Sequence, residues 1–104
     1  MKQVQLRKPG GLDNLHTCNA DIPEPEAHEV LIRVKASSLN YHDLLVALGH
    51  IPTEDKRVPL SDCGGEVIKI GNEVSMWKIG DQIMSCCLLF EYRMMKYFLK
   101  LLDY

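Results

Sequence analysis

The 104-residue sequence has few aromatic residues, little excess charge of either sign and no long hydrophobic run. The 12 Lys and Arg nearly balance 14 Asp and Glu, giving a formal net charge of −2, so the broad positive surface of a nucleic-acid-binding protein is excluded. No segment reaches the roughly 20 apolar residues that span a bilayer, and the N-terminus lacks the apolar run of a secretion signal. We therefore expect a cytoplasmic protein without membrane or nucleic-acid partners.

The four cysteines are poorly placed for a disulfide framework. Two of the four cysteines, Cys86 and Cys87, are adjacent, and vicinal cysteines rarely bridge without strain. Without a secretion signal, the sequence favours free thiols in a reducing compartment.

Short alternating segments predict a mainly β protein. The clearest strand covers residues 29–36, where Val30, Ile32 and Val34 share one face. Other strands are expected at 2–7, 15–20, 66–70 and from 82 to about 86, with a further apolar stretch at 74–79. Gly and Pro residues separate them, and short strands with frequent turns are typical of a small barrel or sandwich.

Residues 41–48 change to a helical period. Ser38 or Asn40 is the expected N-cap, Asp43 lies in the first turn, and Gly49 ends the helix. The sequence thus predicts one short helix inserted between the third and fourth strands.

The last 17 residues, 88–104, have a different composition from residues 1–87. They contain no Gly or Pro, and Arg93, Lys96, Lys100 and Asp103 form one narrow stripe on a helix. We predict an amphipathic helical tail after a single domain at 1–87. Its broad apolar face has three candidate partners: the surface of the domain, which requires the fewest assumptions, another helix or a second copy of the chain, and a membrane surface.

Five short motifs occur in an order that is informative together. They are "EVLIRV" at 29–34, "SLNYHD" at 38–43, "PLSD" at 59–62 followed by "GGEV" at 64–67, "IG" at 70–71 and "KIGD" at 78–81. Residues 1–85 thereby resemble the N-terminal, GroES-like domain of medium-chain dehydrogenases/reductases, in the zinc-type alcohol dehydrogenase-like and quinone oxidoreductase branch. This resemblance implies a partly open β-barrel with one inserted helix. It also implies NADPH-dependent hydride transfer to a quinone, activated alkene or carbonyl substrate.

The zinc ligands of the family are replaced in this sequence. Zinc-using members have Cys where this chain has Asn40, and Gly-His-Glu where it has Leu60-Ser61-Asp62. Neutral amide and hydroxyl groups are poor Zn²⁺ ligands compared with thiolate and imidazole. We therefore expect no metal site.

The nucleotide-binding half of the family is missing from the sequence. No Gly-rich phosphate turn leads from a strand into a helix, and no βαβ repeat is present. We expect a truncated, substrate-side domain that does not hold NADPH tightly and is inactive alone. The alternative is a non-catalytic interaction module that uses the tail, or an edge of the barrel, to bind a partner or to form a homo-oligomer.

The resemblance points to three candidate catalytic residues, Asn40, Tyr41 and Asp62. It places Asn40 near the nicotinamide, as a cofactor-binding residue too, and Tyr41 beside the substrate. Structural roles stay open for all three: Asn40 as a helix cap, Tyr41 as an aromatic lid of the barrel, and Asp62 as a cap of the turn at residues 64–65.

Overall fold

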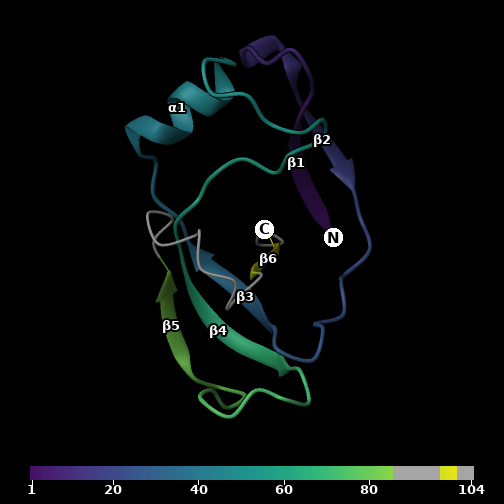
Figure 1. Cartoon of the computed structure of the whole chain (residues 1–104), viewed down its shortest axis with the longest axis vertical. Helices are drawn as coiled ribbons and strands as arrows, with labels where there is room; N and C mark the ends of the chain where they lie inside the picture. The colour runs from purple at the N-terminus through teal and green to yellow at the C-terminus, as the bar shows by residue number, and fades with distance from the viewer. Residues whose placement is uncertain (86–96, 101–104) are drawn as a thin grey trace.

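The computed structural model describes residues 1–85 and the backbone of residues 97–100 (Figure 1). A four-stranded sheet in the order β5-β4-β3-β6 contains β3 (Val30–Ala36), β4 (Cys63–Ile70), β5 (Gln82–Ser85) and β6 (Tyr97–Lys100). Strand β4 pairs antiparallel with both β3 and β5, whereas β6 pairs parallel with β3. This sheet carries most of the buried side chains.

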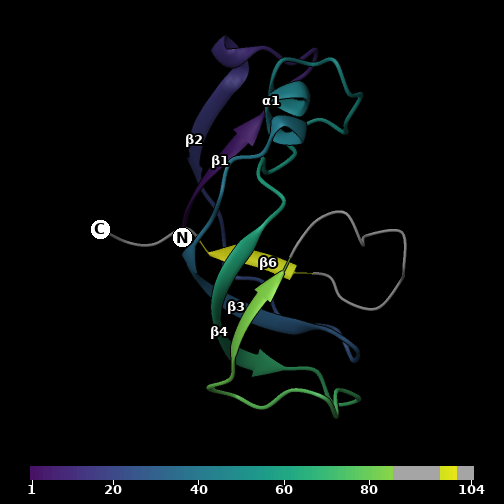
Figure 2. The same ribbon diagram turned by 90° about the vertical axis from the view of Figure 1, so that its left-hand side faces the viewer.

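A second, two-stranded sheet lies at the other end of the molecule. It consists of β1 (Lys2–Leu6) and β2 (Leu15–Asn19), paired antiparallel and joined through the single-turn helix η1 (Leu12–Asn14). In Figure 2 the two sheets lie one above the other, with the helix α1 (Tyr41–Ala47) beside the smaller one. The fold is mainly β and its sheets are not closed into one barrel, as the resemblance implies.

The core sits on one face of the larger sheet. Its buried members come from the three antiparallel strands: Val30, Ile32, Val34, Cys63, Val67 and Ile83. Each large apolar side chain buried there contributes about 1.5–3 kcal/mol relative to exposure. Trp77 packs against this cluster from the loop between β4 and β5, which agrees with a packing role for the only tryptophan.

Strand β4 begins earlier than the alternation of residues 66–70 indicates, because it includes two glycines. A Cβ on Gly65 would lie 2.4 Å from the carbonyl oxygen of Arg33 on β3, whereas one on Gly64 would have nothing closer than 3.9 Å. The backbones of β3 and β4 therefore approach each other closely at Gly65.

The inserted helix is confirmed, but only some of its apolar residues are buried. Asp43, Val46 and Ala47 are its buried residues, whereas Tyr41 and Leu44 are exposed. The apolar spacing along residues 41–48 identified the helix correctly and marks a surface other than the core. Residues 74–79 form a loop rather than a strand, and Val74 and Trp77 pack against the core cluster from it.

The helix predicted for the tail is wrong at Tyr97–Lys100, which form strand β6 instead. The pairing runs from Val30 opposite Tyr97 to Arg33 opposite Lys100. Aromatic residues favour strands, and an unpaired edge of β3 is a template for pairing, so these two effects outweigh a charge stripe. The rest of the predicted tail, 88–96 and 101–104, lies outside the described residues, as do Cys86 and Cys87.

Candidate functional site

The candidate site is built around the start of α1. Asn40 occupies the N-cap with extended backbone angles, and it forms a capping box with Asp43. The backbone N–H of Asn40 donates to Oδ2 of Asp43 over 2.9 Å. Residues with this pairing fix the first turn of a helix, so the position of Asn40 is set by backbone as well as side-chain contacts.

Asp43 also connects the helix to the segment that precedes β4. Its Oδ1 accepts a hydrogen bond of 2.9 Å from the hydroxyl of Ser61, and the side chain is only 4% exposed. A buried carboxylate needs such donors, because an uncompensated charge away from water is costly. Asp43 therefore holds two site-forming segments together.

Asp62 contacts Asn40 directly. The side-chain amide of Asn40 donates to Oδ2 of Asp62, and the hydroxyl of Ser38 lies 3.5 Å from the same oxygen. The hydroxyl of Ser37 donates to the backbone oxygen of Asp62 over 2.6 Å. Two of the three candidate residues are thus brought together, and Asp62 binds the Asn40 amide.

A pocket of about 630 Å³ opens beside Asn40. This volume lies within the range of small-molecule sites, which are mostly apolar with a few polar groups. Its wall is formed by the helix start, the smaller sheet and the segment before β4: Val4, Leu12, Leu15, Leu39, Asn40, Tyr41, Asp43, Leu44, Ala47, Val58, Pro59 and Leu60. Asn40 and Asp43 are the polar members.

Exposed apolar side chains at this pocket explain the helical pattern of residues 41–48. Leu39 is 82% exposed, Tyr41 75% and Leu44 45%, although all three line the wall. Grouped apolar residues left in contact with water mark a binding surface. Tyr41 therefore lies at the pocket rim, on the same wall as Asn40.

Leu60 adds backbone strain to the pocket wall. Its φ is 73°, in the left-handed region that a bulky side chain rarely adopts. Strained backbone of this kind clusters at ligand sites. Leucine itself gives no local signal of a positive φ, but the family's glycine at the position of Leu60 agrees with one. The importance of Asp43 did have a signal, since an acidic residue three positions after an Asn cap is typical of a capping box.

The free thiol of Cys63 follows directly after Asp62 at the start of β4. Burial raises its pKa, and the negative charge of Asp62 raises it further. The thiol is the unreactive protonated form at neutral pH, so Cys63 is a core residue rather than a nucleophile. Cys18 is free as well.

The donor groups at the replaced zinc position do not suit that metal. Asn40 and Asp62 bind each other, Ser61 donates to Asp43, and the described residues contain no cluster of three His, Cys, Asp or Glu that could hold an ion. Amide and hydroxyl oxygens are hard, neutral ligands, unlike the thiolate and imidazole of zinc sites.

The pyrophosphate of NADPH does not fit the start of α1 either. The Asp43 carboxylate occupies this helix end through its bond to Asn40, and Asp62 lies beside it. Negative charge there repels phosphate, which elsewhere binds at uncapped helix N-termini.

No helix among the described residues is long and apolar enough to cross a membrane.

Comparisons with known proteins agree with this geometry. Residues 26–98 match the family described as the alcohol dehydrogenase GroES-like domain. The mouse synaptic vesicle membrane protein VAT-1 homolog-like is 40% identical over 87 residues, which cover 82% of this chain and 21% of the mouse protein.

Two solved structures share the fold. The human VAT-1 homolog-like protein superposes with a TM-score of 0.74 and 41% identity, covering 81% of this chain and 27% of the human one. Escherichia coli quinone oxidoreductase, complexed with NADPH, has a TM-score of 0.73 and 25% identity, with 81% of this chain and 26% of that chain covered. This chain spans about a fifth to a quarter of the length of these proteins. It belongs to the alcohol dehydrogenase GroES-like domain family, in the quinone oxidoreductase-like branch of the medium-chain dehydrogenases/reductases.

Proposed function

We propose that this chain is the substrate-side domain of a zinc-independent, NADPH-dependent oxidoreductase that reduces a quinone, activated alkene or carbonyl. The observation that carries the proposal is the apolar pocket whose wall includes Asn40, with the amide of that residue held by Asp62. A flat conjugated substrate needs an apolar wall for its rings and a hydrogen-bond donor for its oxygen. The pocket offers both.

Asn40 is the proposed binding group for the substrate oxygen. A side-chain amide has two N–H donors, and Asp62 accepts from this amide. The second N–H is available to a carbonyl oxygen, on which negative charge develops during reduction. Asp62 is then a positioning residue, and the exposed ring of Tyr41 is placed to cover the bound substrate at the rim.

NADPH supplies the hydride in this reaction, and Asn40 would lie beside its nicotinamide end. Donor and acceptor must be held together by both halves of such an enzyme, so the 104-residue chain is inactive alone. The free thiols of Cys18 and Cys63 suit a cytoplasmic location.

The alternative of a tail-mediated interaction module or homo-oligomer has less support. Most of the predicted tail lies outside the described residues, and Tyr97–Lys100 form a strand instead of part of a helix. We therefore retain the substrate-side domain as the proposal.

Calorimetric titration with duroquinone tests it, because this fully substituted quinone does not alkylate thiols. Leu44→Ser alters the pocket wall and should weaken binding about fivefold or more, since it removes roughly 1 kcal/mol or more of apolar contact. The matched control is Met84→Ser, at a 90% exposed position outside the pocket, which should leave binding unchanged. Equal effects of both variants, or no saturable binding to the wild type, contradict the proposal.

A further inference from the structure

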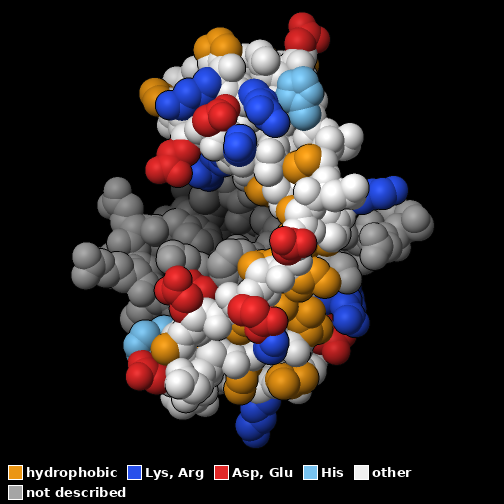
Figure 3. All heavy atoms as spheres, turned by 90° about the vertical axis from the view of Figure 1, so that its right-hand side faces the viewer, with side chains coloured by type: hydrophobic (Ala, Val, Ile, Leu, Met, Phe, Trp, Pro, Cys, Tyr) orange, Lys and Arg blue, Asp and Glu red, His pale blue; other side chains and the backbone are white. Residues whose placement is uncertain are grey.

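Two segments that are distant in the sequence and carry four basic residues lie side by side at one end of the molecule. Arg7 and Lys8 follow β1, and Lys56 and Arg57 lie in the loop that runs beside it. Leu6 forms a β-bridge with Arg57, with its N–H donating to the Arg57 carbonyl over 2.8 Å. We call Arg7, Lys8, Lys56 and Arg57 the basic patch. Figure 3 shows several Lys and Arg side chains on the upper part of one face, with Asp or Glu side chains between them.

The four residues of the basic patch have no ion-pair partner among the described residues, as is also true of the scattered Lys2, Arg33 and Lys78. Lys35 pairs with Glu66 over 2.9 Å, and Lys69 pairs with Glu24. In the part of the chain that the structure describes, no salt bridge involves any of the four residues of the patch, and all four are exposed. Their charges are therefore available to an external anion.

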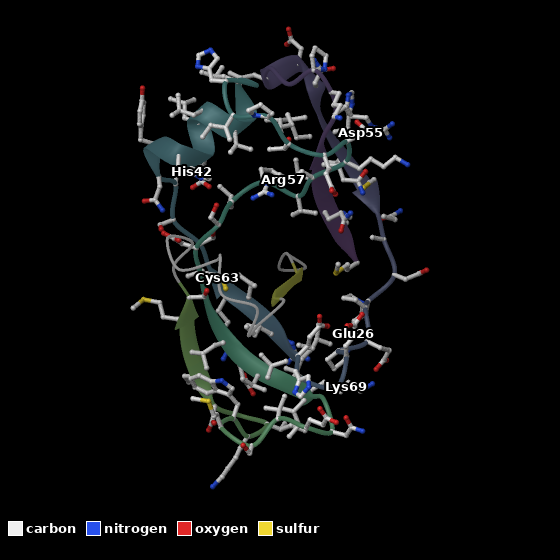
Figure 4. The ribbon with its side chains drawn as sticks, viewed as in Figure 1. Glu26, His42, Asp55, Arg57, Cys63 and Lys69 are labelled. Atoms are coloured by element: carbon white, nitrogen blue, oxygen red, sulfur yellow. The ribbon has the colours of Figure 1, made fainter. Side chains whose placement is uncertain are left out.

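Of the two neighbouring carboxylates in this loop, Glu54 and Asp55, Asp55 has a structural role. Oδ1 of Asp55 accepts a hydrogen bond of 3.0 Å from the backbone N–H of Lys8, which ties the loop to the end of β1. This bond, with the nearby charges of Arg7 and Lys56, lowers the pKa of Asp55. Figure 4 places Asp55 and Arg57 on the same loop alongside β1. Two cations of the patch, Arg7 and Lys56, thus lie near enough to Asp55 to act on its charge, in a chain whose net charge is −2.

Lys56 occupies this patch at an energetic cost. Its φ is 64°, in the left-handed region where Gly and Asn are favoured and a long side chain is strained. A turn selected only for folding would carry one of those residues. Keeping a lysine in this conformation indicates that its charge is used.

We propose that the basic patch binds an acidic segment of a partner protein. Arg provides a planar fork for carboxylates and Lys adds flexible point charges, so a few spaced Asp or Glu side chains satisfy the patch. A nucleic acid is a poorer match, because the chain is net negative and the patch contains no aromatic side chain for stacking. A uniformly anionic membrane is also a poorer match, because its headgroups would be repelled by the carboxylates of Asp55 and the exposed Glu54.

The experiment is a titration of the full 104-residue chain with a short oligo-glutamate peptide. Binding is monitored through the NMR chemical shifts of the backbone amides. We expect salt-sensitive binding that shifts the amides around residues 6–8 and 55–58. Lys56→Asn should weaken binding about two- to fivefold, the range for loss of one exposed charge pair, while its melting temperature stays equal or rises. Lys78→Gln removes an exposed lysine outside the patch and should bind as the wild type does.

Arg57→Gln serves as a second variant, because it removes charge and keeps the backbone bond from Leu6. Equal weakening by Lys78→Gln shows that only net charge matters and overturns the proposal. So does a failure of the peptide to bind, whether or not vesicles containing phosphatidylserine bind instead.

Discussion

Asp43 on α1 and Ser61 before β4 are joined by a hydrogen bond of 2.9 Å between the serine hydroxyl and Oδ1 of the carboxylate. The same carboxylate holds the backbone N–H of Asn40 through Oδ2. One buried side chain therefore fixes both segments that carry the candidate site, the helix start and the residues that replace the zinc ligands of the family.

This double role predicts unequal costs for two substitutions. Ser61→Ala removes one partner and should lower the free energy of unfolding by about 1 kcal/mol. Asp43→Ala removes the cap and the link together and should cost about 3 kcal/mol. Urea denaturation measures both. An Asp43→Ala variant no less stable than Ser61→Ala would show that the link and the cap do not act together.

The glycine pair at the start of β4 gives a matched test of sheet packing. Gly65→Ala places a methyl group 2.4 Å from the Arg33 carbonyl oxygen and should destabilise the chain by about 3 kcal/mol. Gly64→Ala meets no atom nearer than 3.9 Å and should change stability by less than about 1 kcal/mol. Thermal unfolding of the two variants separates these values. Similar melting temperatures would contradict the packing of β4 against β3.

Cys63 makes stability depend on pH on the alkaline side. Because burial and Asp62 raise its pKa, the folded chain holds the thiol proton more tightly than the unfolded chain does. The resulting stability is present below the ordinary thiol pKa of 9.0 and is lost as the pH rises through the higher folded pKa.

Urea denaturation over this alkaline range tests the assignment. The free energy of unfolding of the wild type should fall more steeply with rising pH than that of Cys63→Ala. The alanine variant has no thiol to ionise, so the cavity it leaves lowers stability by the same amount at every pH. Parallel curves for the two proteins would show that another group causes the loss.

Much of the fold follows from local patterns. Alternation located β3 within one residue, and the Asn-to-Asp spacing before α1 set the helix start. Which face of the helix is turned to the core was not predictable in the same way. Tyr41 and Leu44 have the spacing of core residues, yet they line a pocket. A period identifies an apolar face, and only tertiary structure shows what covers it.

The site was predictable in part. The resemblance singled out Asn40 and Asp62, and the structure brings them into contact. The strained Leu60 and the ring of apolar residues around it come from separate segments, so no single stretch of sequence reveals them. Strand β6 was missed because its pairing with β3 is a long-range contact.

If this chain binds only the substrate and the other half of the enzyme binds NADPH, the chain alone should have no reductase activity. The 104-residue chain mixed with NADPH and duroquinone should consume NADPH no faster than the blank, because hydride transfer needs donor and acceptor held together by both halves of such an enzyme. Absorbance at the nicotinamide band follows the reaction. Steady turnover that scales with protein concentration would mean that this chain holds both reactants.

The most direct measurement is a pair of NMR titrations of the isotope-labelled chain, one with duroquinone and one with NADPH. We expect saturable shifts with the quinone at the pocket wall, including Asn40, Leu44 and Leu60, and no saturable shifts with NADPH. Tight NADPH binding, or quinone shifts confined to the exposed face around Met84, would contradict this expectation.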